Sequence, residues 1–198
     1  MTGHTSVPIL VHDGKPLGES SAIITYLDEA FPEKLLTPSD PDLKQEALEW
    51  ERYADEHIGD HVRRVCYHTL LEYPDIVIPF FTDNGPWYGK FVLKRIYPTL
   101  HQRMRKLMNI NAESAQQSRQ KLDQATDKVF SHLQGKEFMV GNQFTRADLA
   151  VASLLAPLCM PSKYGLNWPE RYPEELNELV ASYADKLRWV TEMYEGCR

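Results

Sequence analysis

Residues 6–20, SVPILVHDGKPLGES, form the stretch that decides the fold at the N-terminal end of the chain. Asp13-Gly14 stands between two short apolar runs, and an Asp-Gly pair in that setting is typical of a hairpin with a type I′ turn. Pro16 has no N–H for a strand ladder, so we expect the second strand to be short or to lie at an edge. The stretch therefore predicts two short antiparallel strands.

A helix is predicted directly after this hairpin. Ser20 is the expected cap, because its hydroxyl can accept from a free N–H of the first turn. Apolar residues then recur at helical spacing until Phe31-Pro32 ends the pattern. The repeating residues are Ala22, Ile23, Tyr26, Leu27 and Ala30.

The remainder of the chain has a helical pattern after a proline-rich connection. Residues 32–41 contain three prolines and predict a linker. Prolines and the Asp83–Pro86 turn signal predict an irregular segment before the second long helix. Thr145 and Asp148 predict a capping box at the start of another helix. Apolar spacing predicts further helices over residues 42–70, 87–108, 112–133, 174–183 and 187–194.

Composition excludes several classes of protein. The 198-residue chain carries a net charge of −6 with a pI near 5.6, which argues against nucleic acid as a partner. Cys66, Cys159 and Cys197 lie far apart without a CxxC pair, as suits a reducing compartment. The N-terminus lacks the pattern of a signal peptide, and the longest apolar run is too short to cross a bilayer. We expect a cytoplasmic protein.

Two motifs, about 125 residues apart, resemble the glutathione transferase family. Val7–Leu10, the Asp13-Gly14 turn and Glu19–Ile23 follow one another as in the second half of that family's N-terminal domain. Phe144–Asp148 is similar to the capping box that starts the buried helix of its C-terminal domain. The aromatic-rich residues 168–194 are similar to the end of bacterial members.

The resemblance implies a fold that is mainly α, within an α+β family. A truncated thioredoxin-like ββα unit would precede an all-helical glutathione-transferase C-terminal bundle. Residues 1–32 would then form a partial thioredoxin-like domain that binds glutathione, residues 33–41 a linker, and residues 42–198 the helical C-terminal domain.

The resemblance also implies a glutathione site. Val7 and Pro8 would be joined by a cis bond, and Val7 would exchange main-chain hydrogen bonds with the cysteinyl part of glutathione. Glu19 and Ser20 would hold its γ-glutamyl end. Elementary physics agrees, because a helix N-terminus favours a carboxylate and Glu19 can accept from an ammonium group. The alternative is that Ser20 is only a cap and Glu19 only a surface charge.

The sequence departs from the family before Val7. The family's catalytic Ser, Tyr or Cys belongs to a βαβ unit of about 30 residues, for which the chain has no room upstream of the hairpin. No catalytic residue can therefore be assigned. We expect the chain to be a fragment, or to have a misassigned start. It could instead pair its hairpin edge with another chain or a second copy, or be a non-catalytic relic.

Two functions follow from the resemblance. The first is transfer of the glutathione thiol, as co-substrate, to a small hydrophobic electrophile, with the thiol-activating group upstream. The alternative is a non-catalytic, glutathione-transferase-like interaction module in a protein assembly. A homodimer is expected by family analogy, although the absent unit belongs to the usual interface.

Two further clusters have a functional and a structural interpretation. His57 and His61 share one helix face at the spacing of a metal pair, but no third ligand is evident, so we predict no metal site. In the family this helix borders the cleft, which makes His57, His61 and Arg64 candidate substrate contacts.

Residues 84–112 carry six basic and no acidic residues. That pattern fits contact with an anionic membrane. We favour a bundle helix paired with acidic neighbours such as residues 42–60.

Overall fold

The computed structural model describes residues 8–196, and it begins with the predicted hairpin. β1 (Ile9–His12) pairs antiparallel with β2 (Lys15–Gly18), in a register that runs from Ile9 opposite Gly18 to His12 opposite Lys15. Asp13 and Gly14 have φ values of 49° and 73°, the two positive angles that a type I′ turn requires. The turn prediction is confirmed.

α1 (Ser20–Ala30) follows the hairpin, but Ser20 does not cap it. The cap position belongs to Glu19, whose φ of 68° turns the chain into the helix one residue earlier than predicted. No side chain caps the N–H groups at the start of this helix. The prediction of Ser20 as the cap is therefore wrong, and Ser20 is instead the first helical residue.

One long, continuous helical segment, called the rod below, runs through the helical part of the molecule. It consists of α2 (Pro41–Ala54), a π-helical turn η2 (Asp55–Gly59) and α3 (Asp60–Leu70). In the helix predicted over residues 42–70, the apolar side chains of Ala47, Trp50, Ala54 and Ile58 are buried, whereas Leu43 is exposed. The π turn was not predicted, because one extra residue per turn does not interrupt an apolar pattern over so short a distance.

α4 (Pro74–Phe81) occupies a segment that was predicted to be irregular. Pro74 lies in the first turn, where a backbone N–H would have no acceptor within the helix. Its missing N–H therefore costs nothing there, and this proline can start the helix. Val77 and Ile78 form a small separate core with Tyr97 of α5 (Gly89–Leu107). The prediction of an irregular segment was wrong because the packing of α4 on α5 stabilises a helix despite its two prolines.

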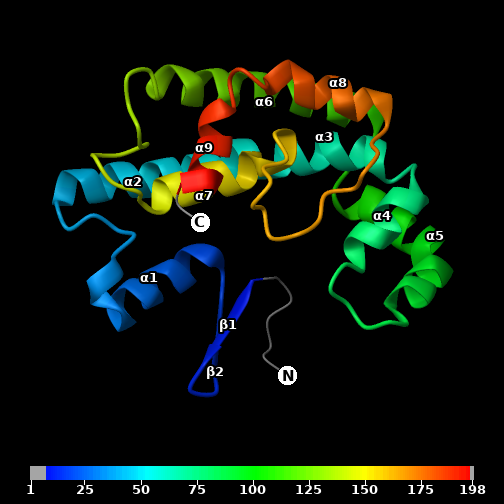
Figure 1. Ribbon diagram of the computed structural model, residues 1–198, viewed down its shortest axis with the longest axis horizontal. Helices are drawn as coiled ribbons and strands as arrows, with labels where there is room; N and C mark the ends of the chain where they lie inside the picture. The colour runs from blue at the N-terminus through cyan, green and yellow to red at the C-terminus, as the bar shows by residue number, and fades with distance from the viewer. Residues whose placement is uncertain (1–7, 197–198) are drawn as a thin grey trace.

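The main core lies around α7 (Arg146–Leu155), which is surrounded by other helices (Figure 1). The 3-10 turns η1 (Pro32–Lys34) and η3 (Ala156–Leu158) follow α1 and α7. The hairpin and α1 lie together on one side of the bundle, below α7 in Figure 1. The other helices are α6 (Ala112–His132), α8 (Glu174–Tyr183) and α9 (Arg188–Gly196).

The fold class is confirmed: a short two-stranded sheet and one helix precede a helical bundle. Between residues 8 and 196, none of the helices is both long and apolar enough to span a membrane. The division into units of residues 1–32, 33–41 and 42–198 stays a prediction.

Candidate functional site at the start of α1

Glu19 and Ser20 lie exposed where β2 passes into α1. Within the described part of the chain, neither side chain has a hydrogen-bond or ion-pair partner. Glu19 holds a positive φ that costs a non-glycine residue about 1–3 kcal/mol, and such strain is concentrated at functional sites. The first N–H groups of α1 have no intrahelical acceptor and carry the positive end of the helix dipole. The arrangement offers a carboxylate beside an anion-binding helix end.

Pro8 and Ser20 come together on the wall of a hollow of about 490 Å³ between the hairpin unit and the bundle. The opposite wall is made by α2, η2 and α7, and it includes Glu51, Asp55 and Leu154. Val7, and with it the expected cis bond, lies outside the described residues. The roles of Pro8, Glu19 and Ser20 stay predictions.

Arg146 fastens α1 to the bundle beneath this site. Its side chain is 2% exposed, and each of its five N–H donors has a partner. Nε donates to Glu51 over 2.6 Å, and Nη2 donates to the hydroxyl and the carbonyl of Ser21 over 2.9 and 3.1 Å. Nη1 donates to the hydroxyls of Thr25 and Thr37. One residue of α7 thus fixes the residue next to Ser20.

Sequence reasoning missed Arg146, although it lies inside the motif Phe144–Asp148. A charged residue at the first position of an otherwise apolar buried helix was the available signal. Its neighbour Asp148 behaves as predicted: its carboxylate accepts from the N–H and hydroxyl of Thr145, both over 2.8 Å. It also accepts from the N–H of Met139 over 2.7 Å. Burial raises the pKa of Asp148, and these hydrogen bonds oppose the rise.

The candidate substrate contacts on the rod have different surroundings. His57 is exposed and lies against the Tyr53 ring, whereas His61 is buried and shares a hydrogen bond of 3.2 Å with Ser118. Arg64 donates to the same Ser118 hydroxyl and to the carbonyl of Met108. His61 and Arg64 therefore bind the rod to α6, and a role for these three residues toward substrate stays a prediction. No three potential metal ligands gather anywhere in residues 8–196.

A second hollow lies deeper in the bundle, where α3 and α4 meet the segment between α7 and α8. It is an apolar cavity of about 120 Å³. Tyr172 lines this cavity, and its hydroxyl is buried without a hydrogen-bond partner, alone among the buried side-chain polar atoms of the described residues. The buried thiol of Cys66 also lines it, and burial raises the pKa of Cys66 to about 12.

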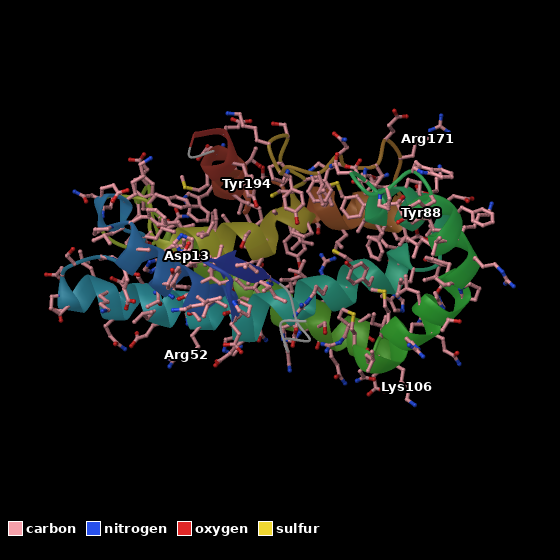
Figure 2. The ribbon with its side chains drawn as sticks, turned by 90° about the horizontal axis from the view of Figure 1, so that it is seen from below. Asp13, Arg52, Tyr88, Lys106, Arg171 and Tyr194 are labelled. Carbon is pink, nitrogen blue, oxygen red and sulfur yellow. The ribbon has the colours of Figure 1, made fainter. Side chains whose placement is uncertain are left out.

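The basic stretch of residues 84–112 is not paired with residues 42–60. Among the described residues, its ion pairs join Arg105, and His101 when protonated, to Glu72 of the loop after α3. Lys90, Lys94, Arg95, Arg103 and Lys106 are exposed, as are the large apolar side chains of Trp87 (94%) and Phe91 (78%). Figure 2 shows Tyr88 and Lys106 of this stretch at the end of the molecule opposite Arg52 on α2. The expected pairing with residues 42–60 is therefore wrong: α5 packs mainly on α4, its acidic neighbour is Glu72, and most of its other side chains are exposed.

The fold and site define a class of protein in which a thioredoxin-like ββα unit packs on an all-helical domain. Residues 1–35 match the family model "Glutathione S-transferase, N-terminal domain", and residues 73–182 match "Glutathione S-transferase, C-terminal domain". Because the second match alone covers more than half of the chain, the chain belongs to the glutathione S-transferase family.

Curated relatives are similar over part of their length. The chain is 46% identical over 63 residues to the probable glutathione S-transferase MSR-1 of Nicotiana plumbaginifolia, a match spanning 31% of this chain and 29% of that protein. It is 40% identical over 74 residues to glutathione S-transferase U7 of Arabidopsis thaliana, spanning 37% and 33% of the two chains. These matches cover about a third or less of the relatives. The expected similarity to bacterial members and the truncation stay predictions.

Two solved structures are similar in fold. The beta-etherase LigF of Sphingobium sp. strain SYK-6 aligns with a TM-score of 0.58 at 21% identity, over 96% of this chain and 77% of that one. Rice GST1 in complex with glutathione aligns with a TM-score of 0.53 at 19% identity, over 96% and 70%. At this level of identity the likeness extends to the fold.

Proposed function

We propose that this chain binds glutathione at the start of α1 and belongs to a protein that transfers the glutathione thiol to small hydrophobic electrophiles. The observation that carries the proposal is the pair Glu19 and Ser20 at a helix N-terminus, exposed and without partners in the described chain. A γ-glutamyl group has both a carboxylate, which suits the helix end, and an ammonium group, which suits Glu19. The proposal assigns no catalytic residue within residues 8–196.

Three observations support it. The positive φ of Glu19 at the cap position of α1 is a strained backbone conformation, and such strain is concentrated at functional sites. The buried Arg146 donates to Ser21 while it also binds Glu51 of α2 and Thr37 of the linker, so the first turn of α1 is preorganised. Rice GST1, whose fold is similar, was solved with glutathione bound.

Calorimetric titration with glutathione tests the binding step. We expect Glu19→Gln and Ser20→Ala each to weaken binding by about tenfold, the value of one charge-assisted hydrogen bond. Glu29→Gln, an exposed change at the other end of α1, is the matched control and should bind as the parent does. Glu19→Gly sharpens the test, because it relieves the positive φ while removing the carboxylate. It should keep or raise stability and still lose affinity.

The proposal fails if glutathione does not bind the parent chain, or if both site variants bind as tightly as Glu29→Gln. Turnover is measured separately, with glutathione and an aromatic electrophile in the longest form of the protein that the native locus produces. Glutathione binding without turnover in that form would favour the second function below.

A second function, a non-catalytic interaction module, is favoured by one specific observation. Trp87 is 94% exposed beside Phe91 and a run of basic residues. Because the whole chain carries −6 and residues 84–112 carry +6, the other residues carry −12, so a second copy offers a complementary surface. Sedimentation equilibrium at low and high salt tests this function. Salt-sensitive self-association that Trp87→Ser abolishes would support it, and a monomer at all salt concentrations would exclude self-association through this surface.

A further inference from the structure

We propose that the start of α5, with the loop before it, docks on an anionic lipid bilayer. Trp87 and Phe91 insert among the headgroups, and the lysines and arginines around them meet the lipid phosphates. This surface is called the basic tip below and consists of residues 87–106. Docking of this kind is peripheral and needs no glutathione, so it can fail separately from the proposed function.

Apolar side chains cover two faces of α5. Leu93, Tyr97 and Leu100 belong to the small core that α5 forms with α4. Other large apolar side chains near the start of the helix face solvent instead. They are Trp87 (94% exposed), Tyr88 (52%), Phe91 (78%), Val92 (45%) and Ile96 (49%). Single exposed apolar residues are ordinary, but so dense a group within ten residues marks an interaction surface.

Positive charge surrounds these apolar side chains. Five basic residues of the basic tip are exposed, and none forms an ion pair with another residue in the range 8–196. They are Lys90, Lys94, Arg95, Arg103 and Lys106. Their long stems let the charged ends reach phosphates while the rings between them enter the headgroup layer. A segment that carries Trp and Phe beside Lys and Arg has the composition of helices that lie in the surface of a bilayer.

The shape of the basic tip favours a bilayer over a protein partner. The Trp87 side chain projects from the molecule, and its ring lies against that of Tyr88 with 5.7 Å between the centroids. A projecting ring enters a fluid lipid layer without a preformed pocket, and Trp and Tyr are enriched at membrane–water interfaces. A second copy of the chain, the occupant in the second function, must instead offer a cavity for each ring.

The distribution of charge orients the docked protein. α5 lies at one end of the molecule, and α1 and α2 lie toward the other (Figure 1). Residues 84–112 carry +6 and the remainder carries −12. Because salt screens charges beyond roughly 10 Å, a bilayer that contacts the basic tip attracts its bases and leaves most of the acidic remainder outside its field. The end with α2 therefore points away from the bilayer.

Co-sedimentation with vesicles tests the proposal. We expect the parent chain to bind vesicles of phosphatidylserine mixed with phosphatidylcholine at low salt, and to bind far less at high salt or to phosphatidylcholine alone. Lys90→Gln/Lys94→Gln should weaken binding about 25-fold, the product of roughly fivefold for each charge. Lys44→Gln/Arg52→Gln removes two exposed charges of α2, leaves the same net charge and is the matched control. It should bind as the parent does.

Tryptophan fluorescence tests the insertion of the aromatic side chains. Emission of the parent should shift to shorter wavelength on anionic vesicles, because the Trp87 indole leaves water. Trp87→Phe keeps a large apolar ring, so it should still bind but lose the shift. Trp87→Ser should bind at least about tenfold more weakly, since it removes the inserted apolar area. Both changes lie at a 94% exposed position and should leave folding intact.

Three results would overturn the proposal: no binding to anionic vesicles at low salt, an equal loss in the α2 control, or binding without the shift in emission. Self-association of the chain without any vesicle binding would overturn it as well, and would assign the basic tip to a second copy. Glu19→Gln should bind vesicles as the parent does. If the parent chain binds vesicles but not glutathione, the proposed function fails and the basic tip stands.

Discussion

Arg146 of α7 and Glu51 of α2, 95 residues apart in sequence, form a buried ion pair in which Nε donates to Oε2 over 2.6 Å. The side chains are 2% and 5% exposed. The remaining guanidinium donors bind Ser21, Thr25 and Thr37. One fully bonded arginine therefore joins the first helix, the linker and the bundle.

Arg146→Met should destabilise the protein by about 3–5 kcal/mol, because it leaves Glu51 buried without its partner. The double variant Arg146→Met/Glu51→Met should lose less than the sum of the two single changes, since it removes both charges. Urea unfolding at equilibrium measures each free energy. A loss below about 1 kcal/mol in the single variant would show that the pair is not needed for stability.

Asp148→Ala should cost about 2 kcal/mol, at the upper end of the range for helix caps, because three donors lose a buried acceptor. Asp40 caps α2 by accepting from the N–H groups of Asp42 and Leu43, and it is exposed. Asp40→Ala is therefore the matched comparison and should cost about 1 kcal/mol or less. Equal losses in thermal or urea unfolding would contradict the importance of burial at Asp148.

Cys66 should react slowly with a maleimide in the native protein. Burial raises its pKa to about 12, so at pH 8 its thiolate fraction is about a thousandfold below that of an ordinary thiol with a pKa near 8.5. The experiment uses a Cys159→Ser/Cys197→Ser background, so that mass spectrometry reports Cys66 alone. Urea should restore an ordinary rate. Rapid labelling without denaturant would mean that the thiol is more accessible than the structure indicates.

His61 should make stability depend on pH below neutrality. Burial, and then the charges of Lys121 and Arg64, lower the pKa of His61 below its usual 6.5. The unfolded state therefore takes up a proton first, so the stability due to neutral His61 is lost as pH falls through about 6.5. In urea unfolding from pH 8 to 5, His61→Gln should lose less stability than the parent. His57→Gln, a change at an exposed histidine, should follow the parent's curve.

Local patterns predicted the elements whose signals depend on neighbours in sequence. Asp13-Gly14 specified a type I′ turn because both residues tolerate a positive φ. Thr145 and Asp148 specified a helix start because the donor and acceptors lie three residues apart. α4 was missed because its stability comes from contact with α5, which no local pattern contains. The cap of α1 was misplaced by one residue because Glu19 takes a conformation that propensity disfavours.

The sequence by itself determined the hairpin, most of the helices and the family resemblance, since these follow from short-range periodicity and turn chemistry. It also indicated Glu19 and Ser20, which adjoin one helix end. Only the tertiary structure showed that Arg146 binds Glu51 and Ser21, and that Tyr172 meets Cys66 at an apolar cavity. Those relationships join residues up to 125 positions apart. They exist only once burial has removed water and made each unpaired polar group costly.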